Sequence, residues 1–190
     1  MNKEKIIKQQ LEDSIILKIF LQNNTGILDT IAEQIIQVFR QGNKVVLFGN
    51  GGSASDAQHI AAELVGKFYL NRPSLPAISL TGNISALTAI ANDISYADIF
   101  DRQVQGIVKK GDAVIGFSTS GNSENVIRGI AKAKQIGAVT IAFTGSGGKL
   151  KELADYTLVV PSTDTPRIQE AHITAGHIIC YLVEEAIFGK

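Results

Sequence analysis

GNGGSASDAQHIAAE, residues 49–63, directly follows the apolar run VVLF of residues 45–48. Such a run, bounded by Lys44 and by glycine, is typical of a buried parallel strand. The glycines that follow permit a tight turn and a close approach of the backbone to a ligand. We expect Ser53 or Ser55 to cap the next helix. A strand, a glycine turn and a helix start together predict an α/β fold with an anion-binding site at this point.

The helix after this turn carries His59 and Glu63, which are four residues apart and therefore point from one face. An imidazole and a carboxylate so placed can supply acid–base or metal chemistry. The same spacing is also common in exposed helix pairs that have no function. The spacing alone leaves both interpretations open.

The composition limits the class of protein. With 190 residues, of which 45% are hydrophobic, the chain suits one domain with a sizeable core. Lys+Arg and Asp+Glu both number 18, which argues against a partner that is a nucleic acid or a membrane surface. The single cysteine, Cys180, lies among apolar residues and predicts a core thiol in a reducing, cytoplasmic protein. The N-terminal residues lack the apolar core of a secretion signal, and no stretch is long enough for a membrane span.

Two helices are expected before the first strand. Apolar residues recur at helical spacing over 2–21 and over 26–40, and Gly42 ends the second helix. The first helix is too apolar all round for a simple surface helix, which indicates a subunit interface. Packing within one subunit is the alternative, and the sequence does not decide between them.

Further strands are expected at 76–80, 113–117, 138–143 and 156–160, with helices at 84–91, 98–108, after Ser123 to Gln135, and 166–186. A loop is expected at Asn92-Asp93. Strands that alternate with helices predict right-handed crossovers and a parallel sheet covered on both faces.

A second informative stretch is STSGNS, residues 118–123, which follows the strand at 113–117 and precedes a helix. Its four hydroxyls and the amides of the helix start can bind a phosphate monoester without a nearby cation. An ordinary helix cap is the alternative, but it explains one hydroxyl rather than four. The chain has no Walker lysine here and no GxGxxG pattern after the first strand, so nucleotide and dinucleotide sites are disfavoured.

The final helix carries Gln169, Glu170, His172 and His177. Gln169 and His177 are eight residues apart and share a face, whereas His172 lies on another side and suits packing. His59, Glu63 and His177, with Gln169 as an oxygen donor, would form a divalent metal site of the kind that zinc prefers. The spacing does not show that the two helices meet.

Taken together, GNGGSASDAQH…E, AND, STSGNS and RIQEAHITAGH resemble the phosphoheptose isomerases, a family of sugar isomerase (SIS) domain proteins. The resemblance covers nearly the whole chain. It implies a three-layer sandwich with a five-stranded parallel sheet of order 2-1-3-4-5, preceded by two N-terminal helices and assembled as a homotetramer. The expected organisation is a single SIS domain over 1–190, with a helical pair at 1–42 and an α/β core at 43–190.

The resemblance also assigns the site residues. It implies one zinc ion per subunit on His59, Glu63, Gln169 and His177. It places the substrate on Asn50, Gly51, Gly52, Ser53, Glu63, Asn92, Asp93, Ser118, Thr119, Ser120, Ser123 and Gln169, in part across a subunit boundary. We assign Glu63 as the base and His177 as the acid. Glu63 cannot be a tight zinc ligand and a free base at one moment, and the sequence does not resolve this.

The implied reaction converts sedoheptulose 7-phosphate to D-glycero-D-manno-heptose 7-phosphate through an enediol, as part of heptose biosynthesis for lipopolysaccharide or another glycan. One alternative is a non-catalytic SIS tetramer that binds a replication initiator protein, because RPSLPAISL, residues 72–80, resembles that group. Such relatives are expected to lack the equivalents of Glu63 and His177. Another alternative is an isomerase for a different sugar phosphate.

Overall fold

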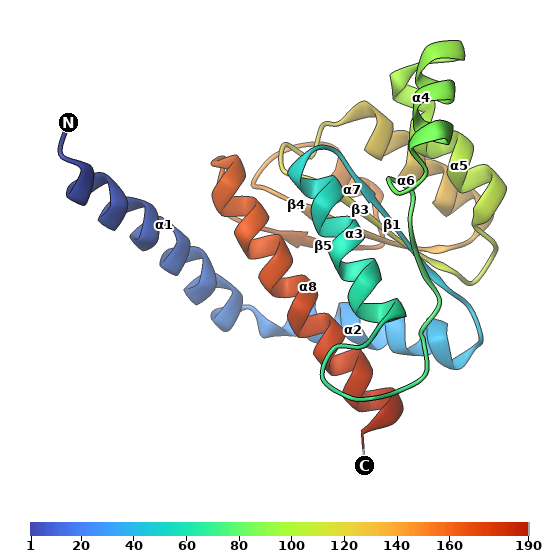
Figure 1. Ribbon diagram of the computed structural model, residues 1–190, viewed down its shortest axis with the longest axis horizontal. Helices are drawn as coiled ribbons and strands as arrows, with labels where there is room; N and C mark the ends of the chain where they lie inside the picture. Colours follow the sequence, from blue (N-terminus) through green and yellow to red (C-terminus); the bar gives the residue numbers. More distant parts are fainter. Residues whose placement is uncertain (190) are drawn as a thin grey trace.

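The computed structural model describes residues 1–189 (Figure 1). The helices are α1 (Lys3–Asn23), α2 (Thr25–Arg40), α3 (Gly52–Val65), α4 (Ile84–Asp93), η1 (Tyr96–Asp98), α5 (Ile99–Ile107), α6 (Glu124–Ile136), α7 (Leu150–Leu153) and α8 (Thr165–Phe188). The strands are β1 (Val45–Gly49), β2 (Ala77–Ser79), β3 (Ala113–Ser118), β4 (Val139–Thr144) and β5 (Tyr156–Val159).

The five strands form one parallel sheet of order β2-β1-β3-β4-β5, which confirms the expected topology. The chain leaves β1 toward one edge of the sheet and β3 toward the other, so the strand order reverses between them. Gly49, the last residue of β1, lies opposite Phe117 of β3. The loops that follow these two strands therefore meet at the switch point, where open α/β sheets bind ligands.

Helices cover both faces of the sheet and bury two separate apolar clusters. Helices α2, α3 and α8 pack on one face, together with the end of α1. Helices α5 and α6 cover the other face, with α4 and α7 beside them. The central strands β1 and β3 are buried along their whole length, as their apolar sequences require. The site-bearing helices α3 and α8 thus rest on a rigid sheet.

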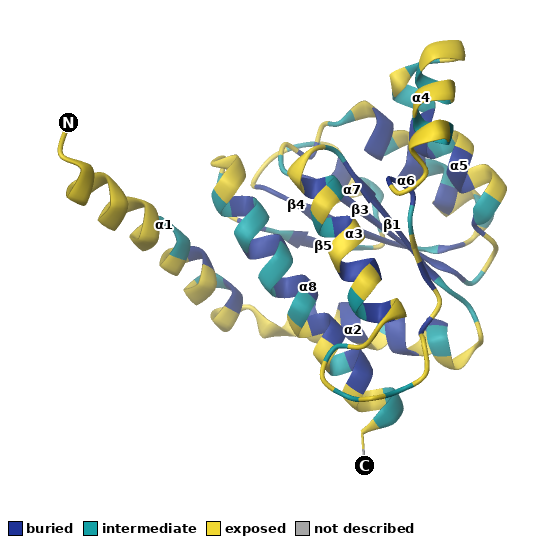
Figure 2. Ribbon diagram, in the orientation of Figure 1, coloured by how far each residue is buried: buried dark blue, intermediate teal, exposed yellow. Residues whose placement is uncertain are grey.

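Helix α1 projects from this body, and its contacts with α8 extend from its C-terminal end back to Gln10, whose carbonyl accepts a hydrogen bond from Arg167 (Figures 1 and 2). Leu17 and Leu21 are its buried residues. Its other large apolar side chains are exposed; they are Ile6, Ile7, Leu11, Ile15, Ile16 and Ile19. Packing within one subunit therefore leaves most of the apolar surface of α1 uncovered. The division into a helical pair at 1–42 and a core at 43–190 stays a prediction.

Three local predictions were wrong. Asn92 and Asp93 do not form a loop but end α4, because the helix continues until Ile94, whose amide still bonds to Ile90. Neither Ser53 nor Ser55 caps α3: the N-cap is Gly51, and both serines lie inside the helix. Helix α7 was not expected, since four residues carry too little periodic pattern to be recognised.

Candidate active site

The glycine turn after β1 is shaped by two close constraints. Gly51 has φ +56, a conformation that side chains with a Cβ rarely adopt. A Cβ on Gly52 would lie 2.5–2.8 Å from the side-chain amide atoms of Gln169. Glycine at both positions therefore lets α3 start immediately after the strand and lets α8 approach its first turn. Ser53 is buried in that turn.

The glycine turn is tied by a pair of amide side chains to the first turn of α6, which directly follows the loop after β3. Asn50 Nδ2 donates to Asn125 Oδ1, and Asn125 Nδ2 donates to Asn50 Oδ1, both at 2.9 Å. The Tyr96 hydroxyl also donates to Asn50 Oδ1. A hollow of about 320 Å³ lies beside the turn, between α3 and α4. The two loops chosen from the sequence are therefore neighbours, as predicted, and open space adjoins them.

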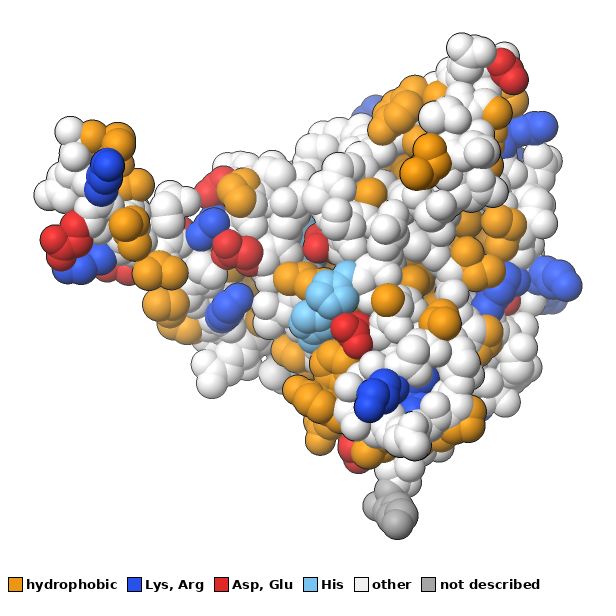
Figure 3. Space-filling view, viewed as in Figure 1, with side chains coloured by type: hydrophobic (Ala, Val, Ile, Leu, Met, Phe, Trp, Pro, Cys, Tyr) orange, Lys and Arg blue, Asp and Glu red, His pale blue; other side chains and the backbone are white. Residues whose placement is uncertain are grey.

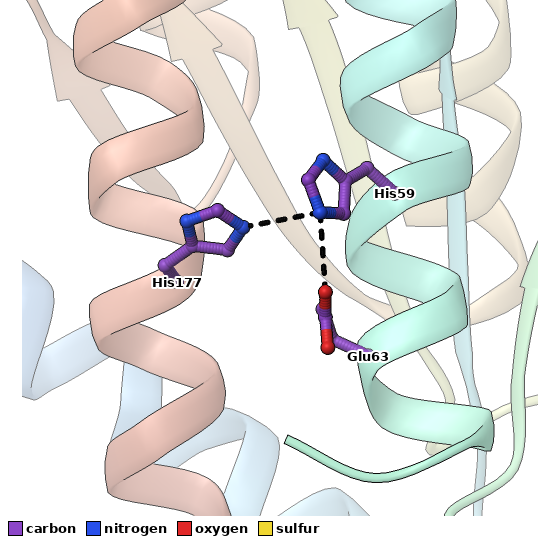
Figure 4. A group of neighbouring side chains, drawn as sticks. All are labelled: His59, Glu63 and His177. Carbon is purple, nitrogen blue, oxygen red and sulfur yellow. Dashed lines mark hydrogen bonds and ion pairs between the residues drawn. The ribbon is translucent and has the colours of Figure 1, made fainter. Parts of the chain in front are cut away.

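The structure brings His59, Glu63 and His177 together across 118 residues of sequence (Figure 4). His59 Nε2 lies 3.1 Å from Glu63 Oε1 and 3.3 Å from His177 Nε2. The first two come from α3 and the third from α8, and the two helices pack side by side. The pale-blue imidazoles and the neighbouring carboxylate reach the molecular surface in Figure 3. The uncertainty about whether the two helices meet is thus resolved.

These three side chains fit a zinc ion. Zinc bonds to nitrogen and oxygen of about 2.0–2.1 Å in a tetrahedron separate neighbouring ligand atoms by about 3.3 Å. Two of the separations, 3.1 and 3.3 Å, match that edge length, and the ligand atoms of all three residues lie within 4.8 Å of one another. The facing Nε2 atoms of His59 and His177 can each offer a lone pair to a cation when the ring proton is on Nδ1. The donor set therefore suits a divalent metal, although geometry alone does not name it.

The protonation of the site is shaped by its surroundings. Burial, helped by the nearby charge of His59, lowers the pKa of His177, while Glu63 opposes the shift. The neutral, metal-binding form of this imidazole is therefore favoured. Burial also raises the pKa of Asp56 to about 6, against the effect of His59. Its Oδ2 has no hydrogen-bond partner among the described residues. Asp56 was not assigned from the sequence, although its position three residues before His59 could have drawn attention to it.

Gln169 and His172 lie on α8 ahead of His177. The Gln169 amide lies against the first turn of α3, at Gly52, so its role as a metal ligand stays a prediction. His172 is fully buried, and its Nε2 lies 3.2 Å from the Thr144 carbonyl, to which it donates. Burial lowers the pKa of His172 to about 4, against that hydrogen bond. His172 thus has the packing position expected from the sequence.

Three hydroxyls of the loop at 118–123 lie close to one another. The Ser118 hydroxyl donates to Ser123 Oγ at 3.0 Å and lies 3.5 Å from Ser120 Oγ. Ser123 is the N-cap residue of α6 but makes no capping side-chain hydrogen bond. The simple capping explanation of the hydroxyls therefore does not describe this loop. Its hydroxyls and the adjacent helix start remain available to an anion.

The chain is similar to proteins of one known family. The profile of the SIS domain family matches residues 13–145. The chain is 53% identical over 185 residues to a phosphoheptose isomerase of Aquifex aeolicus, covering 97% of each chain. It is 57% identical over 164 residues to a phosphoheptose isomerase of Clostridium acetobutylicum, covering 86% of this chain and 84% of the other.

The chain belongs to the phosphoheptose isomerase family of SIS domain proteins. Solved structures of this family are also similar to it. The phosphoheptose isomerase of Francisella tularensis has a TM-score of 0.94 at 34% identity, with 97% of this chain and 100% of the other covered. That of Neisseria gonorrhoeae has a TM-score of 0.90 at 37% identity, with the same coverage.

Two residues that resemblance to this family assigned to the substrate lie on α4, which also lines the hollow beside the glycine turn. Asn92 and Asp93 are exposed at the end of α4, where Asn92 Nδ2 donates to Asp93 Oδ1 at 2.8 Å. Helix α4 packs mainly on α5 and η1, away from α8 (Figure 1). The contact of this pair with the substrate stays a prediction.

Proposed function

We propose that this protein is a phosphoheptose isomerase that converts sedoheptulose 7-phosphate into D-glycero-D-manno-heptose 7-phosphate for heptose biosynthesis. The observation that carries the proposal is the grouping of His59, Glu63 and His177 in a chain of this family. A ketose–aldose isomerisation needs a base that takes a proton from the first carbon and an acid that serves the second. The group supplies both.

Glu63 is the proposed base. Its Oε1 faces His59, and the carboxylate has a second oxygen that can take the carbon-bound proton. The carboxylate can therefore serve as both metal ligand and base, with one oxygen toward the imidazoles and the other toward the sugar. His177, which lies across from it on α8, is the proposed acid that returns a proton to the second carbon or its oxygen.

We propose that each subunit holds one zinc ion, on His59, Glu63 and His177, with Gln169 as the fourth donor. The separations of the first three side chains support this site. The ion would supply Lewis-acid stabilisation of the negative charge that develops on the sugar oxygens. The chain's own residues would orient the sugar and move its protons.

The phosphate of the substrate is proposed to bind the loop at 118–123 and the buried Ser53. Phosphate oxygens accept hydrogen bonds from hydroxyls and from helix-start amides, and both are present at this loop. Asn50, Gly51 and Gly52 would contact the sugar between the phosphate and the group His59, Glu63 and His177, called the triad below. Asn50 and Gly51 also line the hollow beside the glycine turn.

We further propose that the chain assembles as a homotetramer. The exposed apolar side chains of α1 support this, because an apolar surface of this extent is otherwise costly in water. Exposed Tyr69 and Tyr181 beside His177 support burial of that face as well. Among the described residues no helix is long and apolar enough to cross a membrane. The buried free thiol of Cys180 fits the cytoplasmic location predicted from the sequence.

The test is an isomerase assay on sedoheptulose 7-phosphate beside six-carbon ketose phosphates, with and without added zinc. We expect turnover of the seven-carbon sugar, lost on chelation and restored by zinc. Turnover of a six-carbon ketose phosphate alone would favour the other sugar-phosphate isomerase. An absence of turnover and of solvent-deuterium exchange on every ketose phosphate would favour the binding module that contacts a replication initiator.

A further inference from the structure

A buried ion pair joins the two helices that carry the triad. The side chains of Arg72 and Glu184 are 2% and 1% exposed, and Arg72 Nε donates to Glu184 Oε1 at 2.8 Å. Arg72 lies in the segment between α3 and β2, whereas Glu184 is on α8, seven residues beyond His177. Charges this deep in a protein persist only when they are fully hydrogen-bonded.

Glu184 fixes the chain just after α3. Its two carboxylate oxygens accept hydrogen bonds from the consecutive amides of Phe68, Tyr69 and Leu70, at 3.0, 2.6 and 2.9 Å. Burial opposes ionisation of the carboxyl, but the three amides and Arg72 outweigh it and lower the pKa of Glu184 to about 2. The segment is thereby held against α8 by an acceptor that stays charged over the whole neutral range.

Arg72 holds the end of α3 itself. Its guanidinium donates from Nη2 to the Glu63 carbonyl at 2.8 Å and from Nη1 to the Leu64 carbonyl at 2.7 Å. These carbonyls belong to the last turn of the helix, where the carbonyl oxygens have no hydrogen-bond donor within the helix. The residue whose carboxylate faces His59 is therefore held through its own backbone by Arg72.

The same segment also touches the other half of the triad. The ring of Phe68, whose amide bonds to Glu184, lies with its centroid 5.7 Å from that of His177. The pair thus contacts the backbone of Glu63 through Arg72 and supports the ring beside His177 through Glu184.

We propose that Arg72 and Glu184 are positioning residues, which set the separation of α3 and α8 so that His59, Glu63 and His177 meet at metal-binding distance. The inference rests on the proposed function in its metal site. Zinc tolerates deviations of only about 0.2 Å in its bonds. A contact that fixes the separation of the two ligand-bearing helices therefore affects zinc affinity without touching the ion. Residues that hydrogen-bond to metal ligands typically change metal affinity by about 10–100-fold.

A second buried pair provides a matched control. Lys44 precedes β1 and Asp112 precedes β3, and neither residue belongs to α3 or α8. Asp112 is buried and also accepts hydrogen bonds from the backbone amides of Lys44 and Lys109. Breaking this pair should lower stability by a comparable mechanism while leaving the separation of α3 and α8 unchanged.

The experiment measures zinc affinity by chelator competition in the full-length protein, with thermal melting of the zinc-free form alongside. Arg72→Lys keeps the positive charge but loses the planar fork that reaches Glu184 and two carbonyls at once. We expect its zinc affinity to fall by about tenfold or more. We expect kcat for the isomerisation to fall, with KM for the sugar phosphate within about twofold of wild type, because the phosphate loop is distant from the pair.

Asp112→Asn should lower the melting temperature but retain wild-type zinc affinity. If Arg72→Lys does not fold, Glu184→Gln carries the same expectation.

His59→Ala, which should abolish tight binding, identifies the measured zinc as that of the triad. Wild-type zinc affinity in folded Arg72→Lys, or an equal loss in Asp112→Asn, would overturn the inference while leaving the proposed function intact. A wild type that binds zinc tightly but isomerises no sugar phosphate would refute the proposed function, while the affinities of the variants still decide the positioning role. A wild type without tight zinc binding would overturn both the metal site and this inference.

Discussion

The phosphate loop at 118–123 and the triad are built in different ways. The loop is one continuous segment between β3 and α6, and its hydroxyls contact one another within six residues. The triad joins two helices whose ligands are 118 residues apart, and it opens at the surface. A loop of this kind is specified locally, whereas the triad depends on helix packing and on whatever covers its face.

This difference indicates a division of labour. The loop can hold an anion as soon as β3 and α6 form, and it contributes no group that titrates near neutral pH. The triad contains the titratable groups and adjoins exposed apolar surface at Phe68, Tyr69 and Tyr181. We therefore expect mutations in the loop to weaken binding and mutations in the triad to remove chemistry, and the predictions test that separation.

The largest effect is expected for Glu63→Gln. The substitution keeps the size of the side chain and removes its basic group, and loss of a general base costs about a hundred- to ten-thousand-fold in rate. Binding of the sugar phosphate should change much less, because the phosphate is held elsewhere. The measurement is incorporation of solvent deuterium into recovered sugar phosphate, which wild type should catalyse and the variant should not.

Zinc content should be measured in the same Glu63→Gln preparation, because Gln can still offer an oxygen to the metal. Exchange at the wild-type rate in the variant would make Glu63 a metal or structural residue rather than the base. Loss of zinc together with loss of exchange would call for the comparison to be repeated at saturating zinc.

The reverse pattern is expected for Ser120→Ala combined with Ser123→Ala. Each lost hydrogen bond to a charged group is worth roughly 1.5–3 kcal/mol, so apparent affinity should fall more than tenfold. The rate at saturating substrate should fall less than the affinity. Inhibition by inorganic phosphate provides the readout, with Ser55→Ala, an exposed serine of α3, as the control. Unchanged affinity would reduce the loop to a connection between β3 and α6.

The sequence predicted most of this arrangement because its signals are local. The run 45–48, the glycine turn and STSGNS specify strands and loops within a few residues, and all five strands lie where they were expected. The meeting of His59 with His177 could not be derived from periodicity, since it depends on packing between α3 and α8. The Arg72–Glu184 pair could not be predicted either, because in the sequence each residue resembles an ordinary surface charge. The predicted loop at Asn92-Asp93 was wrong because α4 continues through both residues despite their turn propensity.

A smaller and more selective effect is expected from Ile15→Glu combined with Ile19→Glu on α1. Both side chains are exposed in the single subunit, so the changes should leave its fold intact. Charges on an apolar contact surface should dissociate the assembly, observable by light scattering at micromolar concentration. Activity should then fall, because the triad face loses its cover, while phosphate binding to the locally built loop should persist. Gln9→Glu with Gln10→Glu adds the same charge to α1 without removing an apolar side chain, and should leave the assembly intact. A wild type that is a stable monomer would refute the tetramer.

The smallest effect on either region is expected at His172, which links the two. Its helix, α8, carries His177. Its Nε2 donates to the Thr144 carbonyl, and the amide of the next residue, Gly145, donates to Thr119 of the phosphate loop. Its pKa is lowered from 6.5 to about 4 in the folded protein. Below the unfolded value, the unfolded chain binds a proton that the folded chain refuses, so stability must fall as the pH drops from about 6.5 to 4. The upper bound is roughly 3–4 kcal/mol, from about 1.36 kcal/mol for each unit of pKa. His172→Gln keeps a hydrogen donor and does not titrate, so urea unfolding of the variant should lose less stability over this range, while at neutral pH both regions should work as in wild type. Asp56 titrates in the same window but contributes equally to both proteins. Equal acid sensitivity of the two proteins would mean that His172 is hydrated, and that α8 is not held over the loop by a buried neutral imidazole.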